Sequence, residues 1–487
     1  MKNNLKKSAI QKNTLFNVVK TFSSILYPLI TFPYVSRILM PENVGKVNFG
    51  NSIVSYFSLV ATLGISTYAT RECSKAKKNK ILLQQTASEL FSINLISTLI
   101  AYVGLTILLV AAKPLSNYRI LICIQSAIII FTTLGADWLN MAMEDFEFIA
   151  IRTVSFQIIS VVLMVLLVRK PEDYLVYAII SVIASSGANI INIFYRKKYC
   201  NLHFIFSKSL ARHLTSIVTM FSMTLSQTIY CNSDITILGL IKGDYEVGLY
   251  STSVKIYNLV NSTVASIVWV VLPGLSEAFS EKNYEEISKL LKYALNFILV
   301  LGFPCIVGIN VITQPLLSVI GGQEYVKASV SLHILSVSLC FSFLGGWLGN
   351  MSMLPAGKEK NCLQASIISA ITNVAMNFLL IPLFGLNAAA TTTAVAECVG
   401  FLFLIKRFDK SIKIDGIAEM TKAPIIGCIG IALVAFIATK TFRSDLSVVV
   451  FTIAGGIIIY VGVLIALKDK FIMKFLNPII SNLKNQI

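Results

Sequence analysis

Residues 446–467 read LSVVVFTIAGGIIIYVGVLIAL, an apolar stretch that contains no charged side chain. A transmembrane helix needs about 20 mostly apolar residues to cross about 30 Å of hydrocarbon, so this segment is long enough to span a bilayer. Comparable apolar segments recur along the whole chain. The sequence therefore predicts an all-α membrane protein of about fourteen transmembrane helices. We place them at residues 13–39, 46–68, 86–112, 118–143, 148–168, 174–195, 212–240, 246–272, 290–312, 328–353, 362–383, 386–405, 423–440 and 446–467.

The composition of the chain excludes most soluble functions. Apolar residues make up 55% of the 487 positions and charged residues 13%, with a mean hydropathy of +0.76. A soluble domain carries about 25% charged residues, so this surface must be solvated by lipid. The spans leave only short loops and tails, which excludes a large catalytic domain. The nine cysteines include no Cys-x-x-Cys pair and most lie in apolar spans, so we expect neither a metal nor a cofactor.

The distribution of Lys and Arg orients the chain. If Met1 is cytoplasmic, the predicted inside segments hold 29 basic residues and the outside loops hold 8. Because basic residues are retained on the cytoplasmic side, we expect both termini in the cytoplasm and the chain in the inner or plasma membrane of a bacterium. The net charge of +17 has the same explanation and does not indicate nucleic-acid binding.

The two longest basic connectors divide the spans into six helices, six helices and a final pair. Two dipeptides also recur between the first and second sets of six, at an offset of roughly 200 residues. They are Val44-Gly45 with Val247-Gly248, and Trp138-Leu139 with Trp347-Leu348. Two six-helix repeats around a central site form a recurring transporter plan. The predicted parts are a cytoplasmic N-tail at 1–12, an N-lobe at 13–195, a linker at 196–211, a C-lobe at 212–405, a linker at 406–422, a helix pair at 423–467 and a cytoplasmic C-tail at 468–487.

Polar side chains in the first, second, seventh and eighth predicted spans fall on one helix face, at spacings of three and four residues. Lipid would penalise such faces, so we expect them to line a wet cavity. Hydrogen bonds to a neighbouring helix are the alternative explanation. The candidate cavity residues are Asn17, Tyr27, Thr31, Asn48, Asn51, Gln227, Tyr230 and Asn258.

Ionisable side chains inside the spans are a sharper signal, because a charge at the bilayer centre costs at least ~2.5–3.5 kcal/mol. Lys20, Arg37 and Lys255 are candidate binding cations, although Lys20 and Arg37 lie near helix ends from which their charges could reach water. Asp234 and Glu397 are candidate proton or ion sites. Alternatively, Asp234 and Lys255 form a structural ion pair, because their helices are expected to be neighbours.

Several absences narrow the function further. No Gly-x-x-x-x-Gly-Lys-[Ser/Thr] loop occurs, so ATP is not expected to drive transport through this chain. The three histidines are too dispersed for a metal site. The longest predicted outside loop, at 313–327, is too short to hold a carboxylate pair around a sugar. These features favour a transporter over an enzyme.

Four segments in a fixed order carry a family resemblance through roughly the first 260 residues. Together they resemble the Wzx-type polysaccharide flippases of the MOP exporter superfamily, which also holds the MATE drug exporters and the lipid II flippases. Two departures are Ala69, where the family more often has Gly, and Met141-Ala142-Met143, where a Gln-Gly-type turn is commoner. The segments are RILMPENVG at 37–45, YATRE at 68–72, DWLNMAMEDFEFIAIR at 137–152 and GLYSTSVKI at 248–256.

The resemblance implies two six-helix lobes that face each other in a V, flanked by the last helix pair. It implies a substrate of undecaprenyl pyrophosphate carrying one oligosaccharide repeat unit, moved from the cytoplasmic to the outer leaflet for O-antigen, capsule or exopolysaccharide synthesis. Lys20, Arg37 and Lys255 would bind the pyrophosphate, the polar faces would meet the sugars, and Asp234 or Glu397 would couple movement to H⁺ or Na⁺. Membrane lipid and other polysaccharide assembly proteins are the expected partners.

Two alternatives stay open at this point. A MATE-like cation or drug exporter should have an acidic cavity, whereas basic residues are at least as prominent on the faces predicted here. A membrane-embedded polysaccharide polymerase should have a large outside loop that carries catalytic groups.

Overall fold

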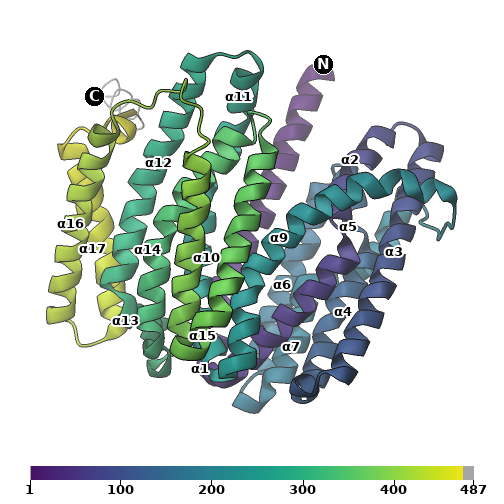
Figure 1. Ribbon diagram of the computed structural model, residues 1–487, viewed down its shortest axis with the longest axis horizontal. Coiled ribbons are helices and arrows are strands. Elements are labelled where there is room, and N and C mark those ends of the chain that lie inside the picture. Colours follow the sequence, from purple (N-terminus) through teal and green to yellow (C-terminus); the bar gives the residue numbers. More distant parts are fainter. Residues whose placement is uncertain (1, 475–487) are drawn as a thin grey trace. The chain divides into compact units, whose positions relative to one another are not determined.

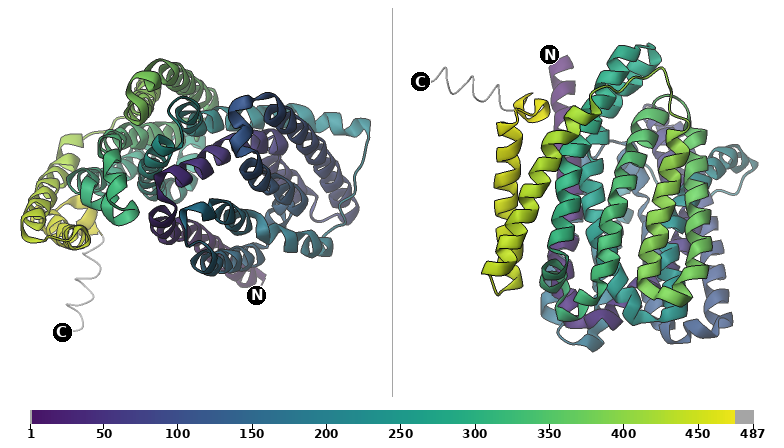
Figure 2. Two further views of the ribbon diagram at one scale, coloured as in Figure 1. Left: turned by 90° about the horizontal axis from the view of Figure 1, so that it is seen from below. Right: turned by 60° about the vertical axis from the view of Figure 1, so that its left-hand side comes forward.

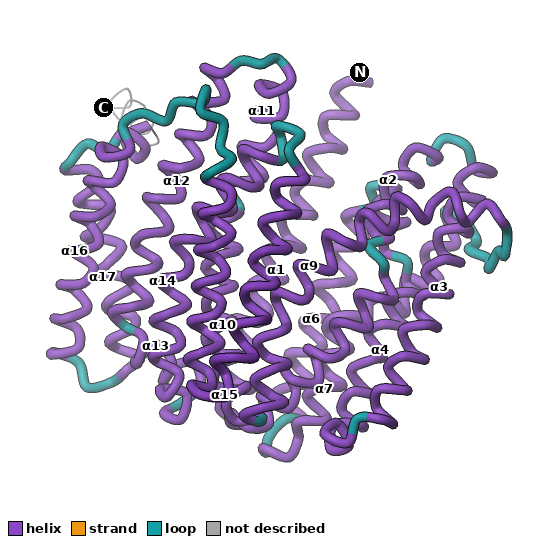
Figure 3. Tube along the Cα trace, in the orientation of Figure 1, coloured by secondary structure: helices purple, strands orange, loops and turns teal. Residues whose placement is uncertain are grey.

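The structure, a computed structural model, describes residues 2–474 (Figure 1). Within that range every regular element is helical and no strand occurs (Figure 3). Large apolar side chains cover much of the surface; Val110 and Ile458, for example, are 72% and 71% exposed. Water would penalise such a surface and lipid would not. The predicted all-α membrane fold is therefore confirmed.

The length and composition of the helices support many membrane crossings. Among the described residues, ten helices are long and apolar enough to span a bilayer, or eleven if the bent pair Asp244–Ala265 and Val270–Ser280 is one span. The stretch 446–467 coincides with the helix Asp445–Ala466, as predicted. The exact total of fourteen, and the side of the membrane on which each terminus lies, stay predictions.

The chain divides into two compact units, Met1–Gly248 and Leu249–Ile487. The first unit includes the helix that corresponds to the seventh predicted span, whereas the sequence placed a lobe boundary at 196–211. That lobe boundary stays a prediction. The helices of the first unit are α1 (Lys2–Thr62), α2 (Ile65–Ala76), α3 (Lys80–Ala111), α4 (Arg119–Gly135), α5 (Asp137–Ala142), α6 (Phe146–Leu167), α7 (Tyr174–Val182), α8 (Ala188–Tyr195) and α9 (Ala211–Lys242).

Helix α1 contains a sharp break that separates the first two predicted spans. Met40 has non-helical backbone angles (φ 61°, ψ 168°), and Pro41 follows it. Proline lacks the N–H that would continue the helical hydrogen bonds and its ring clashes with the preceding turn. The predicted connector at 40–45 is therefore reduced to a single non-helical residue. The part of α1 after Met40 packs along α9 and also contacts α3 and α4, and the part before Met40 contacts α6.

The recurring glycines of the sequence meet at this break. A Cβ atom on Gly45 would lie 1.8 Å from the carbonyl oxygen of Asp244, and one on Gly248 would lie 1.9 Å from the carbonyl oxygen of Pro41. Both neighbours are backbone atoms, so only glycine permits this approach. The repeated Val-Gly dipeptide thus marks two segments of the first unit that contact each other reciprocally.

A buried carboxylate joins α3 to the start of α9. Glu89 is only 1% exposed and accepts hydrogen bonds from His213 Nε2 (3.0 Å), from Ser209 Oγ (2.8 Å) and from the Arg212 guanidinium. The hydroxyl of Tyr68 lies 2.9 Å from His213 Nδ1 and extends the network to α2. These contacts satisfy a carboxylate that would otherwise be costly to bury. Glu89 therefore has a structural role.

A second carboxylate, Asp145, holds the loop after α8 in place. Its Oδ2 accepts hydrogen bonds from Tyr195 (2.7 Å), from Lys198 (3.2 Å) and from the hydroxyl of Tyr199. Burial alone would raise the pKa of Asp145, but the hydrogen bonds from Tyr199, Tyr195 and Lys198 outweigh it and hold the pKa below its usual value. The ionised carboxylate is the form that these contacts stabilise.

We expect Tyr199→Phe to make the protein less tolerant of acid. Because the folded-state pKa of Asp145 is lowered, its contribution to stability is present above the usual Asp pKa of about 3.9 and is lost as the pH falls below it. Removing one donor moves the pKa upward, so the acid-unfolding midpoint should shift to higher pH. Size-exclusion profiles of the detergent-purified protein after incubation at a series of acidic pH values measure this midpoint. Tyr284→Phe, at an exposed tyrosine, is the matched control; equal midpoints for both variants would contradict the prediction.

The second unit is built from helices that pack along one another. The pairs α14 with α15 and α16 with α17 lie side by side, and α12 packs against α14 and α16 (Figure 2). Gly385 interrupts α15 (φ 57°, ψ −134°) at the boundary predicted between residues 383 and 386. Its helices are α10 (Asp244–Ala265, which begins at the end of the first unit), α11 (Ile267–Ser280), α12 (Tyr284–Val311), α13 (Thr313–Gly321), α14 (Ser329–Gly346), α15 (Glu359–Ile405), α16 (Ile417–Thr441) and α17 (Asp445–Ala466).

Candidate functional site

The first part of α1 carries three of the predicted cavity residues and the candidate cation Lys20. Asn17 is exposed, Lys20 and Tyr27 are half-buried, and Thr31 is buried. Thr31 donates its hydroxyl hydrogen bond to the Tyr27 carbonyl of the previous turn (2.8 Å). This polar face therefore changes along the helix, from buried near Thr31 to open near Asn17.

The end of the same face contacts another helix. The Tyr34 hydroxyl donates a hydrogen bond to the carbonyl of Val168, which caps α6 (3.0 Å). Arg37 lies one turn further on and is exposed, three residues before the break at Met40. The alternative explanation of the polar face, hydrogen bonding between helices, therefore holds for Tyr34.

The part of α1 after the break faces α9 through hydroxyl groups that are not among the predicted site residues. Thr236 donates to Ser52 Oγ (2.9 Å), and the Tyr56 hydroxyl lies 3.2 Å from Thr236 Oγ1. The spacing of Ser52 and Tyr56, four residues apart, was the available signal. Of the predicted residues here, Asn48 and Asn51 are half-buried, and the Nδ2 atom of Asn48 is buried with no hydrogen-bond partner among the described residues.

Helix α9 supplies the other predicted residues of the first unit. Gln227 is exposed and donates a hydrogen bond to the sulfur of Cys231 (3.3 Å), and Tyr230 is half-buried. Asp234 is buried, two residues before the Thr236 that bonds Ser52. Because Asp234 belongs to the first unit and Lys255 to the second, the predicted pairing of their charges stays a prediction.

In the second unit, α10 and α15 bring a carboxylate and two tyrosines together. The buried Tyr257 donates its hydroxyl hydrogen bond to Oε1 of Glu397 (3.1 Å). Seven residues earlier on α10, the hydroxyl of Tyr250 lies 3.3 Å from Thr393 Oγ1. The sequence predicted Glu397 as a site residue but missed both tyrosines, whose spacing of two helical turns places them on one face.

The predicted cation of α10 lies near this cluster in the sequence. Lys255 is half-buried and Asn258 is exposed. In the described part of the chain, no three His, Cys, Asp or Glu side chains are grouped as a metal site requires. The predicted residues thus present ammonium, guanidinium, amide, hydroxyl and carboxylate groups on otherwise apolar helices. Such groups can bind a charged, polar cargo and exchange ions.

Comparison with known proteins identifies the family. The sequence model described as "Polysaccharide biosynthesis protein" matches residues 10–279, which is more than half of the chain. The chain belongs to this family. The matched region includes every predicted site residue except Glu397.

Two relatives match over most of their length. A protein of Shigella dysenteriae named as an O-antigen transporter is 24% identical over 82% of this chain and 99% of its own length. The capsular polysaccharide biosynthesis protein CapF of Staphylococcus aureus is 24% identical over 80% of this chain and 97% of its own. The predicted resemblance to polysaccharide flippases is confirmed.

Solved structures share the fold. The lipid II flippase MurJ in an inward closed conformation aligns with a TM-score of 0.73 and 18% identity, over 96% of this chain and 100% of its own. An inward-facing MATE multidrug transporter of the MOP superfamily aligns with a TM-score of 0.56 and 17% identity, over 82% of this chain and 95% of its own. With the family match, these findings make the chain a multi-pass transporter of the bacterial cell membrane and not an enzyme.

Proposed function

We propose that this chain moves undecaprenyl-pyrophosphate-linked oligosaccharide repeat units from the cytoplasmic to the outer leaflet, for the synthesis of a cell-surface polysaccharide. The family match over residues 10–279 carries the proposal, because it covers the three candidate cations and all eight candidate polar residues. The names of the relatives support the substrate class: an O-antigen transporter, a capsular polysaccharide biosynthesis protein and a lipid II flippase.

The chemistry of the substrate fits these residues. A pyrophosphate and several sugars lose their hydration when they leave water, and unpaired charges in hydrocarbon are costly. Lys20, Arg37 and Lys255 would pair with the phosphates through charge-assisted hydrogen bonds. The half-buried amides would meet sugar hydroxyls, and the unpartnered Nδ2 of Asn48 is a donor that such a hydroxyl would satisfy. The polyprenyl tail would stay in the bilayer.

We further propose fourteen crossings and alternating access. The breaks at Met40 and Gly385 divide α1 and α15 into two segments each, and α9 is a further long helix. The ten apolar spans, the bent pair of α10 and α11 taken as one span, the extra segment that each break creates and α9 together give the predicted total. Transport would then follow from rocking two six-helix lobes about the substrate site. Asp234 and Glu397 would couple this movement to H⁺ or Na⁺.

A MATE-like exporter of organic cations is the rival function, because a MATE transporter shares the fold. A cation substrate would require carboxylates to dominate the cavity, as a pyrophosphate requires cations. The candidate residues include three cations and two carboxylates, which favours the anionic substrate.

We expect Lys255→Ala and Arg37→Ala each to slow leaflet exchange of a fluorescent undecaprenyl-pyrophosphate oligosaccharide at least about tenfold, which corresponds to a barrier to exchange that is about 1.4 kcal/mol higher. The measurement uses proteoliposomes with an imposed H⁺ or Na⁺ gradient. Lys255→Arg should retain most of the rate because it keeps the charge. Lys113→Ala and Arg443→Ala, at exposed positions outside the predicted site, are the matched controls.

The outcomes separate the hypotheses. Unchanged exchange in both site variants, with normal folding and insertion, would remove Lys255 and Arg37 from the binding site. Absence of exchange for several glycans, together with uptake of organic cations by the same vesicles, would establish the exporter function instead. Retained exchange that no longer responds to the gradient in Glu397→Gln or Asp234→Asn would identify the coupling residue.

A further inference from the structure

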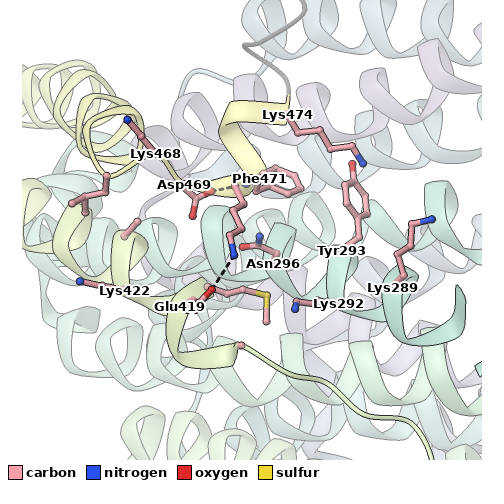
Figure 4. A pocket seen from close by; sticks show the side chains of 15 residues that line it. Lys289, Lys292, Tyr293, Asn296, Glu419, Lys422, Lys468, Asp469, Phe471 and Lys474 are labelled. Carbon is pink, nitrogen blue, oxygen red and sulfur yellow. Dashed lines mark hydrogen bonds and ion pairs between the residues drawn. The ribbon is translucent and has the colours of Figure 1, made fainter. Parts of the chain in front are cut away.

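A basic pocket lies in the second unit, at the start of α12 and α16 and the end of α17 (Figure 4). Its cavity volume is about 400 Å³, and none of the candidate transport residues lines it. Two carboxylates, Glu419 and Asp469, also line it. The lysines that line it are Lys289, Lys292, Lys422, Lys468, Lys470 and Lys474.

Both carboxylates already have partners. Asp469 Oδ1 accepts hydrogen bonds from the backbone N–H groups of Phe471 (2.9 Å) and Ile472 (3.2 Å), and Glu419 pairs with Lys470 (3.0 Å; Figure 4). Lys292, Lys422 and Lys468 are exposed and form no ion pair within the described part of the chain. The pocket therefore has uncompensated positive charge that would attract an anion.

Apolar contacts hold this arrangement of lysines in place. The backbone turns at Lys468 (φ 53°), and the following residues fold back so that the ring of Phe471 packs against Tyr293 (5.4 Å) and Phe297 (6.1 Å) of α12. At the start of α16, Gly416 has φ 77°, a left-handed conformation that glycine adopts without strain. Three segments distant in the sequence thus deliver their lysines to one pocket.

One polar atom inside the pocket lacks a partner. The Oδ1 atom of Asn296 is buried, and no hydrogen-bond donor among the described residues reaches it. Asn296 points into the space between Glu419 and Phe471 (Figure 4). A buried acceptor without a donor is destabilising, and a hydroxyl of a bound molecule would satisfy it.

The outer faces of the same helices are apolar. Ile425, Ile429 and Leu433 of α16 are exposed, as are Ile458 and Ile465 of α17. This apolar surface begins next to the lysines, since Ile425 is three residues from Lys422 and Ile465 is three residues from Lys468. A ligand that fits both surfaces has an anionic head and long apolar chains.

We propose that the pocket binds a lipid-borne phosphate at the cytoplasmic membrane surface. Lysine is a common phosphate ligand, and basic pockets between transmembrane helices on the cytoplasmic side bind anionic lipid headgroups. The distribution of basic residues predicts that this end of α12, α16 and α17 is cytoplasmic. The phosphate belongs either to a membrane phospholipid or to the pyrophosphate of a lipid-linked glycan. The proposal is independent of the transport function, because a phospholipid would bind whether or not the chain moves a glycan.

The test is lipid binding by the detergent-purified full-length protein, followed by native mass spectrometry. The added lipids are phosphatidylglycerol, undecaprenyl pyrophosphate and, as a neutral reference, phosphatidylcholine; sodium phosphate is the soluble competitor. Replacing Lys292, Lys422 and Lys468 with Gln should raise the Kd for one anionic lipid at least about tenfold. The control replaces Lys78, Lys208 and Lys410 with Gln, which removes the same charge from exposed positions elsewhere. If the triple variant does not fold, Lys422→Gln alone should raise the Kd measurably.

Selective loss of phosphatidylglycerol binding in the pocket variant identifies a phospholipid site, and selective loss of undecaprenyl-pyrophosphate binding identifies a glycan-lipid site; either result supports the proposal. Equal losses in the pocket and control variants would overturn it, because the binding would then reflect total charge. Binding of phosphatidylcholine as tight as that of both anionic lipids, or competition by inorganic phosphate at equal concentration, would also overturn it. Failure of leaflet exchange with intact binding of phosphatidylglycerol would reject the transport function alone.

Discussion

Asp137→Ala is expected to lower the free energy of unfolding by up to about 3–5 kcal/mol, because it leaves the buried Arg152 without its counter-ion while the Asp137 side chain itself is 30% exposed. Arg152 of α6 is 4% exposed; its guanidinium binds the Asp137 carboxylate and donates to the carbonyl of Ala188 (3.1 Å). Because arginine stays protonated in proteins, the variant would leave a charge buried without its counter-ion. Unfolding in a series of dodecyl sulfate mole fractions measures the change.

A double variant tests the reason for this loss. Asp137→Ala with Arg152→Met removes both charges, and replacing a buried pair by apolar groups is often neutral, so most of the stability should return. Glu286→Ala breaks the exposed pair with Lys289 and should cost less than about 1 kcal/mol. A double variant no more stable than Asp137→Ala would show that the loss comes from another contact, such as the hydrogen bond that Asn192 donates to Asp137 (3.1 Å).

Gly248→Val is expected to destabilise the first unit by about 1–3 kcal/mol or more, as overpacking does. The added Cβ would lie 1.9 Å from the Pro41 carbonyl oxygen, and this neighbour belongs to the backbone. The segment after Met40 would therefore have to move, whereas a flexible side chain could rotate away. Gly45→Val should have an effect of the same sign, because its Cβ would meet the Asp244 carbonyl oxygen at 1.8 Å.

The matched control for both glycines is Gly308→Ala in α12, where no atom lies within 4 Å of the added Cβ. Alanine is favoured over glycine in a helix by about 1 kcal/mol, so this variant should be neutral or stabilising. The midpoint of thermal unfolding of each purified variant in detergent distinguishes the two signs. A Gly248→Val protein with the midpoint of the unsubstituted chain would mean that the two backbones do not touch.

The ion pair of Asp137 with Arg152 and the close backbone approaches at Gly45 and Gly248 show which features of the fold could be predicted from the sequence. The dipeptides Val44-Gly45 and Val247-Gly248 were visible as a repeat, but a repeat does not reveal that its copies contact each other. Likewise, Asp137 and Arg152 both lie in one recognisable segment. Their ion pair depends on the turn between α5 and α6, where Glu144 has φ 61°. Such a turn is hard to predict from the sequence, because residues other than glycine seldom adopt a positive φ.

The sequence could predict which residues belong to the candidate site, but it could not predict the hydrogen-bond partners of those residues. Glu397 stood out because a carboxylate inside an apolar helix is costly, and that argument needs no neighbour. Tyr257, which donates a hydrogen bond to Glu397, lies 140 residues away from it in the sequence. Nothing in the residues around Tyr257 distinguishes it from other tyrosines in apolar helices. The hydrogen bond between Thr236 and Ser52 was missed for the same reason, since hydroxyl groups are common in transmembrane helices.

The sequence by itself determined the membrane class, the helical content and the excess of positive charge in the loops, because these follow from local hydropathy and from the number of residues needed to cross hydrocarbon. It also determined the family, because its motifs are contiguous. Only the tertiary structure decided which polar groups satisfy one another and where unpaired lysines collect. Such contacts join segments far apart in the chain: Lys292, Lys422 and Lys468 surround one pocket only because α12, α16 and α17 pack together.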